Sequence, residues 1–268
     1  MLTISKILVP TDYSQNAYKA FEYVYNLYSG EDHQFILLNV QNARHAGAIL
    51  TVDVNKDMVK QSHAKMDQLV DDIRAKYPTI RIQGIVTAGT FLDSVIEKTD
   101  EFSTDIVAIG TKGASGVQSV LMGSNAANLI GHSSKPLIVV PENARMNPPM
   151  RGLLAADFVS QPKPSTYDPL LDLCYEHKTH LDILHVARPN EAHFTLNDVP
   201  FNTEGLDFTL NERVDTDVEY AIIDFVQEKD IDLIGIVKSK GGFIHDLFHS
   251  SLTKKLGMHS DTPLLVLV

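Results

Sequence analysis

The sequence predicts an α/β protein with two doubly wound parallel five-stranded sheets in tandem. In the first half, short apolar runs alternate strictly with segments whose apolar residues recur at helical spacing. The same alternation restarts near Arg151. A chain of 268 residues is also long for one domain and comfortable for two. We therefore expect one domain at residues 1–142 and a second at residues 150–268, with a linker between them.

The elements of the first half follow from these patterns in chain order. Apolar runs bounded by turn residues predict strands, and apolar residues three and four positions apart predict the buried stripe of a helix. The expected strands are 6–10, 34–40, 80–86, 106–109 and 136–140, and the expected helices are 14–28, 56–77, 90–102 and 125–132. Such alternation is typical of a parallel sheet covered by helices on both faces, a Rossmann-like arrangement.

Polar or glycine residues follow three of the expected strands. Asp12 comes after the first strand, Val40 ends the second, and Gly110 follows the fourth. Ligands of doubly wound sheets bind beyond the carboxyl ends of the strands, where the strand order reverses. We therefore expect these three positions to meet at one crevice.

Four glycines follow the fourth strand, at Gly110, Gly113, Gly116 and Gly123, and Ser124 then opens a helical segment. A loop of this kind directs backbone N–H groups and a helix N-terminus toward one place, which suits an anionic ligand. No Walker A sequence occurs in the chain. The loop is therefore either a phosphate site of another kind or an ordinary βα connection that binds nothing.

The spacing of Gly110, Gly113 and Gly123-Ser124 resembles the ATP-binding signature of the universal stress protein family. The resemblance covers essentially the whole chain, as a tandem of two such domains. It implies an adenine-nucleotide alpha-hydrolase-like fold with strand order 3-2-1-4-5, a usually dimeric assembly and, in many members, ATP binding. A tandem chain would then be an intramolecular pseudo-dimer, with a homodimer of tandem chains as the alternative.

The resemblance also implies which residues hold the nucleotide. Asp12 would contact the adenosine part, and the backbone of Val40 would recognise adenine. Lys112 lies inside the glycine loop, where it could neutralise a phosphate. Asp12 could also cap the helix that follows, since the two roles can coexist, and Lys112 could be a solvated charge. The predicted ligand-binding residues are Pro10, Thr11, Asp12, Val40, Gly110, Lys112, Gly113, Gly123, Ser124 and Asn125. The expected ligands are ATP or AMP, with Mg²⁺ on the nucleotide, and neither a catalytic residue nor a protein metal site is expected.

The second half repeats the first with losses. Residues 232–268 can be laid on residues 105–141 without a gap. There Val237, Lys240 and Ser250 replace the three motif glycines, while Ser251 and the strand-end Asp157 match their counterparts. We expect that this half does not bind ATP in the family manner. It is also shorter, because a loose connection at residues 189–205 replaces the long helix of the first half.

Composition argues against several classes of function. The net charge is −11 and no basic run occurs, so no nucleic-acid partner is expected. No stretch approaches 18 consecutive apolar residues and no apolar leader opens the chain, which predicts a cytoplasmic protein without a membrane partner. Cys174 is the only cysteine and is expected to be a buried structural thiol. His245 and His249 have the spacing of a zinc pair, but structural or surface histidines are the favoured interpretation.

These observations favour an ATP-binding stress-response or regulatory module with an unknown protein partner. At most slow ATP hydrolysis is expected, because the motif places no general base. Two alternatives stay open: an interaction or scaffold protein with a vestigial site, and a nucleotidyl-transfer enzyme of related fold. The apolar fifth strands, 136–140 and 263–268, are expected to pair with each other or with another chain, because an unpaired apolar edge invites aggregation.

Overall fold

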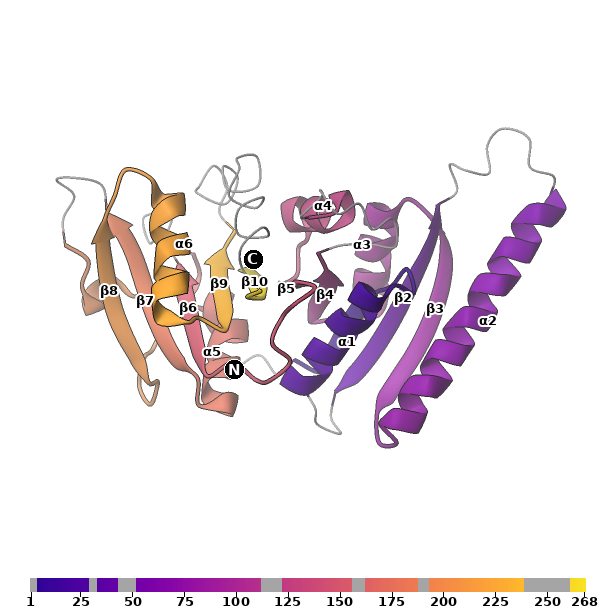
Figure 1. Cartoon of the computed structure of the whole chain (residues 1–268), viewed down its shortest axis with the longest axis horizontal. Helices are drawn as coiled ribbons and strands as arrows, with labels where there is room; N and C mark the ends of the chain where they lie inside the picture. Colours follow the sequence, from indigo (N-terminus) through magenta and orange to yellow (C-terminus); the bar gives the residue numbers. More distant parts are fainter. Residues whose placement is uncertain are drawn as a thin grey trace. The chain divides into compact units, whose positions relative to one another are not determined.

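The computed structural model describes residues 4–28, 33–42, 52–111, 122–155, 162–187, 193–238 and 261–268. The chain divides into two compact units, one spanning Ile4–Lys135 and the other containing Pro136–Val268. Each unit is a sheet with helices packed on it (Figure 1).

The first unit is a parallel sheet whose strands are connected by helices. Its elements are β1 (Lys6–Pro10), α1 (Gln15–Leu27), β2 (Gln34–Asn42), α2 (Val52–Lys76), β3 (Arg81–Gly89), α3 (Phe91–Glu101), β4 (Ile106–Gly110) and α4 (Ser124–His132). The strand order is β3-β2-β1-β4, and all three neighbouring pairs are parallel. Right-handed crossovers place α1 and α2 on one face and α3 on the other. The predicted doubly wound class is confirmed, and the strand order reverses between β1 and β4.

Helix α1 shows how the sequence builds this unit. Ser14 caps the helix, and its side-chain oxygen accepts a hydrogen bond from the Ala17 N–H at 3.2 Å. The apolar stripe predicted from the sequence lies on the sheet: Ala17, Ala20, Phe21, Val24 and Leu27 are all buried. The Phe21 ring meets the Phe35 ring of β2 edge-on, with 5.7 Å between centroids. Burial of each large side chain, Phe21, Val24 and Leu27, contributes about 1.5–3 kcal/mol, so this stripe holds α1 on the sheet.

The second unit repeats this plan with a complete set of five parallel strands. Its elements are β5 (Leu137–Val140), β6 (Arg151–Ala155), η3 (Pro164–Tyr167), α5 (Asp168–His177), β7 (His180–Ala187), η4 (Leu196–Asp198), β8 (Phe208–Val214), α6 (Val218–Lys229), β9 (Leu233–Val237) and β10 (Leu264–Leu267). The parallel strands follow the order β8-β7-β6-β9-β10. Numbered from β6, this is the predicted order 3-2-1-4-5.

The two fifth strands pair with each other, as one of the two sequence-based alternatives predicted. β5 and β10 run antiparallel, with Leu264 opposite Val139 and Val266 opposite Leu137. All four residues of β5 are buried. The strand that ends the first repeat in sequence is therefore part of the compact unit of the second repeat. The linker that follows is bound to the same unit, because the Arg145 guanidinium pairs with the carboxylate of Asp230 at 2.6 Å.

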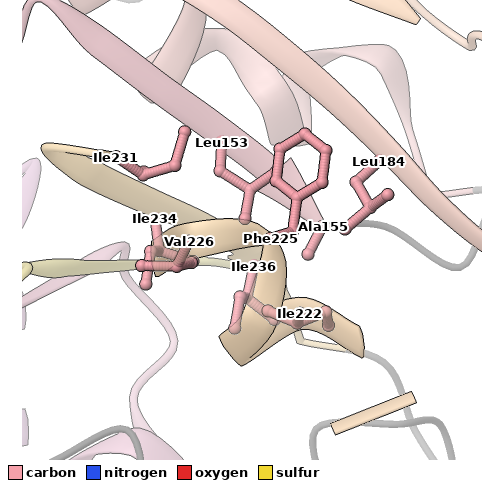
Figure 2. Packing of buried hydrophobic residues seen from close by; sticks show 9 residues of the cluster. All are labelled: Leu153, Ala155, Leu184, Ile222, Phe225, Val226, Ile231, Ile234 and Ile236. Carbon is pink, nitrogen blue, oxygen red and sulfur yellow. The ribbon is translucent and has the colours of Figure 1, made fainter. Parts of the chain in front are cut away.

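The hydrophobic core of the second unit lies between α6 and its sheet (Figure 2). Phe225 of α6 contacts the apolar face formed by side chains of the central strands. The members of this cluster are Leu153, Ala155, Leu184, Ile222, Phe225, Val226, Ile231, Ile234 and Ile236. Alternate positions of β6 and β9 supply four of them, which is the period of two that a sheet face requires.

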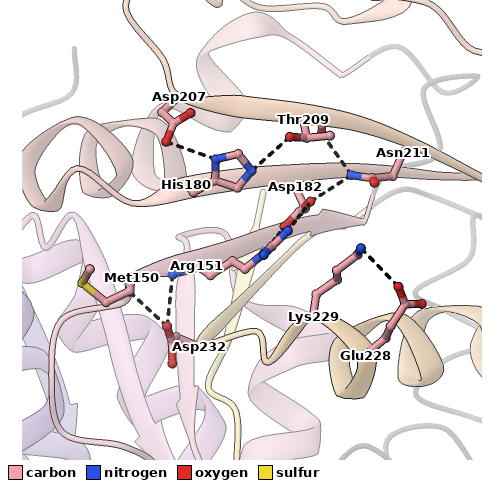
Figure 3. A network of polar contacts seen from close by, with 10 residues as sticks. All are labelled: Met150, Arg151, His180, Asp182, Asp207, Thr209, Asn211, Glu228, Lys229 and Asp232. Atoms are coloured by element: carbon pink, nitrogen blue, oxygen red, sulfur yellow. Dashed lines mark hydrogen bonds and ion pairs between the residues drawn. The ribbon is translucent and has the colours of Figure 1, made fainter.

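A polar network lies on β6, β7 and β8 of this unit (Figure 3). Asp182 is fully buried, and its two carboxylate oxygens accept from Nε and Nη2 of Arg151 at 2.5 and 3.2 Å. The Asn211 side chain donates to the same carboxylate at 3.0 Å. The buried charge is therefore paired and hydrogen-bonded, the condition under which a charge is tolerated in a core.

Equivalent aspartates precede the fourth strand of each repeat, β4 and β9. The Asp105 carboxylate accepts from the backbone N–H groups of Ser5 and Lys6 at 2.8 and 2.9 Å. The Asp232 carboxylate accepts from those of Met150 and Arg151, both at 3.0 Å. The same two bonds therefore recur in both halves, at the sequence offset of 127 between the two aspartates.

The long helix of the first unit has no counterpart between β7 and β8 among the described residues, which contain only the short η4 there. Residues 193–207 cover that part of the sheet instead. The Phe194 ring stacks on His185 of β7 at 5.2 Å, and the Phe194 N–H donates to the Glu212 carboxylate of β8 at 2.6 Å. The Tyr167 and Phe201 rings meet at 4.8 Å. Aromatic side chains from an extended segment thus replace the packing that a helix provides in the first unit.

Candidate functional site

The sequence-predicted site residues gather around the point where the strand order of the first unit reverses. Pro10 ends β1, Gly110 ends β4, and these two strands are neighbours in the sheet. In a doubly wound sheet the crevice between two such strand ends is where ligands bind. Lys112 and Gly113 lie outside the described residues.

The turn after β1 presents the Asp12 side chain to solvent. One carboxylate oxygen of Asp12 accepts from the Ser14 N–H at 3.0 Å, while Ser14 itself caps α1. The alternative that Asp12 is the helix cap is therefore wrong. Thr11 is buried, and its N–H donates to the Leu38 carbonyl at 2.8 Å, so the turn starts from a fixed point on β2.

Strand β2 continues past the end of its pairing with β1, and Val40 lies in this extension. The backbone groups of Gln34 and Leu38 face β1, as the bonds Gln34 N–H to Ser5 O at 2.7 Å and Thr11 N–H to Leu38 O show. Alternate residues of a parallel strand face the same neighbour, so Val40 also directs its N–H and C=O toward the β1 side. The register with β1 ends at Pro10 opposite Leu38. The N–H and C=O of Val40, two residues after Leu38, are therefore directed toward the crevice beyond the end of β1.

Gly110 has a packing role that the sequence motif did not predict. A Cβ built there would lie 2.9 Å from the backbone oxygen of Asn16 and 2.6 Å from its side-chain nitrogen. The space that this glycine leaves empty is therefore occupied by the first turn of α1. Gly110 lets α1 cross close over the end of β4.

The N-terminus of α4 has the geometry of an anion site. Gly123 is the N-cap residue, and its N–H donates to the Thr111 carbonyl at 2.7 Å. Within the part of the chain that the structure describes, no side chain caps this helix, and the next residues, Ser124 and Asn125, are exposed. Uncapped N–H groups and the positive end of the helix dipole favour an anionic ligand at such a position.

Sequence reasoning missed a buried polar network beside these residues. Asn39 donates from its side-chain nitrogen to the Thr11 carbonyl at 2.7 Å, and its side-chain oxygen accepts from the Ser62 hydroxyl of α2 at 2.8 Å. The Tyr13 hydroxyl donates to the Ser62 carbonyl at 2.8 Å. Burial raises the pKa of Tyr13 above its ordinary value, so this hydroxyl keeps its proton at neutral pH. The signal in the sequence is the pair of amides, Asn39 and Gln41, at the end of an apolar strand.

The second unit differs at the equivalent strand ends. Val237 takes the place of Gly110 and is buried. Helix α5 begins only at Asp168, after η3, whereas α1 begins at Gln15, five residues after the end of β1. The longer connection removes the reason for a glycine at the end of β9. The other residues compared there, Asp157, Lys240, Ser250, Ser251 and the pair His245 and His249, lie outside the described residues.

Other candidate functional groups are structural in the described parts of the chain. Cys174 is buried, and burial raises the pKa of its thiol to about 12, so the predicted structural thiol is confirmed. The described residues contain no group of three or more His, Cys, Asp and Glu side chains that could hold a metal ion. Among the helices within the described ranges, none combines the length and the apolar character needed to span a membrane.

Fold and site together define a tandem doubly wound α/β protein whose first unit has an open strand edge and an uncapped helix at the strand-order reversal. The sequence profile of the universal stress protein family matches residues 3–141, just over half of the chain. The chain therefore belongs to the universal stress protein family.

Individual relatives cover this chain to different extents. Universal stress protein MJ0577 of Methanocaldococcus jannaschii is 25% identical over 151 residues, which cover 50% of this chain and 93% of the relative. The crystal structure of a universal stress protein from Archaeoglobus fulgidus covers 98% of this chain and 95% of its own, with a TM-score of 0.75 and 21% identity. A putative universal stress protein from Pseudomonas aeruginosa covers 99% and 93%, with a TM-score of 0.61 and 12% identity. These two structural likenesses show the fold.

Proposed function

We propose that the unit Ile4–Lys135 binds an adenine nucleotide, ATP or AMP, and acts as a nucleotide-dependent stress-response or regulatory module. The observation that carries the proposal is the open main-chain edge of Val40. An N–H donor and a C=O acceptor that face the same side can pair with the N1 and N6 edge of adenine. Recognition through the backbone needs no particular side chain, which explains why an apolar valine suits the position.

The neighbouring groups fit the rest of a nucleotide. The exposed Asp12 carboxylate is an acceptor for ribose hydroxyls. Asp12 follows the end of β1, the neighbour of the strand that carries Val40. The α4 N-terminus at Gly123 and Ser124 supplies donors for phosphates. The three contacts come from β1, β2 and α4, the segments that converge at the strand-order reversal.

Mg²⁺ fits this site as part of the nucleotide. Mg²⁺ prefers oxygen ligands and commonly takes them from substrate phosphates, with one or two from the protein. The exposed Ser124 hydroxyl is a side-chain oxygen directly after the N-cap residue of this helix. A magnesium ion bound there would neutralise phosphate charge in a chain of net charge −11.

In the proposed arrangement the second unit is a degenerate universal stress protein domain that does not bind ATP in the same way. The chain acts as an intramolecular pseudo-dimer, for which the β5 and β10 pairing supplies the support. Its protein partner and its cytoplasmic location stay predictions from the sequence.

The test is isothermal titration of the nucleotide-free full chain with ATP and Mg²⁺. Wild type is expected to bind one ATP per chain. Gly123→Val is expected to bind about tenfold to hundredfold more weakly, because a side chain at the cap blocks charge-assisted bonds to the helix N–H groups. The φ and ψ angles of Gly123, −64° and 151°, suit valine, so the variant is expected to fold.

The matched control is Gly131→Val, in the same helix, where a Cβ meets no atom within 4 Å. Its affinity should equal that of wild type. Two sites per chain would show that the second unit also binds ATP. Absence of binding by wild type would refute the proposal and favour an interaction protein with a vestigial site.

A further inference from the structure

Asp12 and Val40, the two residues proposed to contact the nucleoside, have sequence neighbours that are hydrogen-bonded to each other. Asp12 is flanked by Thr11 and Tyr13, and Val40 is preceded by Asn39. The Asn39 side chain donates to the Thr11 carbonyl at 2.7 Å, and the Tyr13 N–H donates to the Thr11 hydroxyl at 3.0 Å. The end of β2 and the turn after β1 are therefore held in one arrangement by side-chain hydrogen bonds.

The same network ends on helix α2. The Ser62 hydroxyl donates to the Asn39 side-chain oxygen at 2.8 Å, and Gln41 donates to both of these groups. The Tyr13 hydroxyl donates to the Ser62 carbonyl at 2.8 Å and lies 2.9 Å from its hydroxyl. A helix that contributes no predicted ligand-binding residue thus holds both sides of the proposed nucleoside end.

Burial and backbone conformation indicate that the surrounding structure fixes the arrangement of these hydrogen-bonded residues. Asn39 and Ser62 are each only 4% exposed, so their polar groups depend on one another for hydrogen bonds. Tyr13 has a φ of 64°, a left-handed conformation that is costly for a bulky side chain. Such a conformation persists only where the surroundings impose it. The bonds from the Tyr13 N–H and hydroxyl are what hold it here.

We propose that Tyr13, Asn39 and Ser62 are positioning residues that set the geometry of the nucleoside end and couple its occupancy to the docking of α2. This inference rests on the proposed nucleotide site and adds its regulation. Coupling is reciprocal: if the docked α2 favours nucleotide binding, bound nucleotide must favour the docked α2 by the same factor. Helix α2 would then be the element whose stability reports on nucleotide occupancy.

The first test compares ligands that share the nucleoside and differ in phosphates. Tyr13→Phe and Ser62→Ala are titrated in the full chain with adenosine, AMP and ATP. Each variant is expected to weaken all three ligands by a similar factor, about fivefold to tenfold, because the network touches only the nucleoside end. Gly123→Val is expected to weaken ATP much more than adenosine. A Tyr13→Phe variant that binds all three as wild type does would overturn the inference.

Tyr25→Phe is the matched control. It also removes a tyrosine hydroxyl from the first unit. Within the described residues the structure shows no hydrogen bond from Tyr25, whose ring packs on the Tyr77 ring with 4.1 Å between centroids. A purely structural role of the network would lower the melting temperature and leave the affinities of the folded protein unchanged. That pattern would count against positioning.

The second test measures hydrogen exchange along α2 with and without saturating ATP. Exchange around Ser62 is expected to slow on binding in wild type and to respond much less in Tyr13→Phe. An unchanged α2 in ATP-bound wild type would overturn the coupling. Failure of wild type to bind any of the three ligands would instead refute the proposed function itself, so the two failures can be told apart.

Discussion

Gly110→Ala is the substitution for which the structure gives the sharpest expectation. The new Cβ would lie 2.9 Å from the backbone oxygen of Asn16, closer than Cβ atoms are found. Overpacking of this kind costs about 1–3 kcal/mol. Replacing a strand glycine returns about 0.5–1 kcal/mol of backbone entropy. The net expectation is a loss of about 1 kcal/mol in the free energy of unfolding of the first unit.

The assay is urea denaturation of the full chain followed by circular dichroism, with the two units fitted as separate transitions. Gly152→Ala in β6 is the control, because a Cβ there meets its nearest atoms at an ordinary 3.5 Å. Its unfolding free energy should rise by about 0.5–1 kcal/mol, because the gain in backbone entropy is not offset there by a close contact. Adding Asn16→Ala to Gly110→Ala should restore only part of the loss, since the backbone oxygen remains. A Gly110→Ala variant as stable as wild type would refute the reasoning that this glycine serves packing.

Two further predictions concern the second unit. Asp182→Ala leaves the Arg151 charge without its buried partner and should lower stability by about 3 kcal/mol in denaturant titrations; a change below 1 kcal/mol would contradict the assigned pairing. Hydrogen bonds from the Phe194 N–H and from His193 hold the pKa of Glu212 below its ordinary value. Its stabilising contribution is therefore present above the unfolded pKa of about 4.3 and is lost as pH falls through the lower folded pKa. Glu212→Gln should flatten the pH dependence of the melting temperature below pH 5, and an unchanged dependence would exclude this role for the carboxylate.

The fold could be predicted from the sequence because its elements carry strong local signals. The apolar run Lys6–Pro10 and the stripe on Gln15–Leu27 agree with the structure to within a residue or two. Both are examples of periodicity that burial on one or two faces imposes. The pairing of β5 with β10 was one of two outcomes left open, because an apolar edge shows that a strand needs a partner without showing which one.

The predicted site residues stay predictions, and the structure adds contacts around them that the sequence did not indicate. The glycine motif made Gly110 a candidate ligand-binding residue, and the structure shows in addition that Gly110 leaves room for α1. That contact joins residues almost a hundred positions apart, so no local pattern could reveal it. The network of Asn39, Ser62 and Tyr13 was missed for the same reason. A serine within a long polar helix looks like a surface residue until the fold places it against the end of β2.

Strand β5 follows the first repeat in sequence but belongs to the compact unit of the second, and this has a consequence for the expression of either half alone. A gene truncated after the first repeat would encode β5 without the β10 strand on which it lies. The remaining half would in turn expose β10, of which Leu265, Val266 and Leu267 are almost completely shielded in the full chain. Each fragment would present a short apolar edge able to recruit a second copy of itself. Recombinant halves are therefore expected to self-associate. Their oligomeric state would result from the truncation and would not indicate the oligomeric state of the full chain.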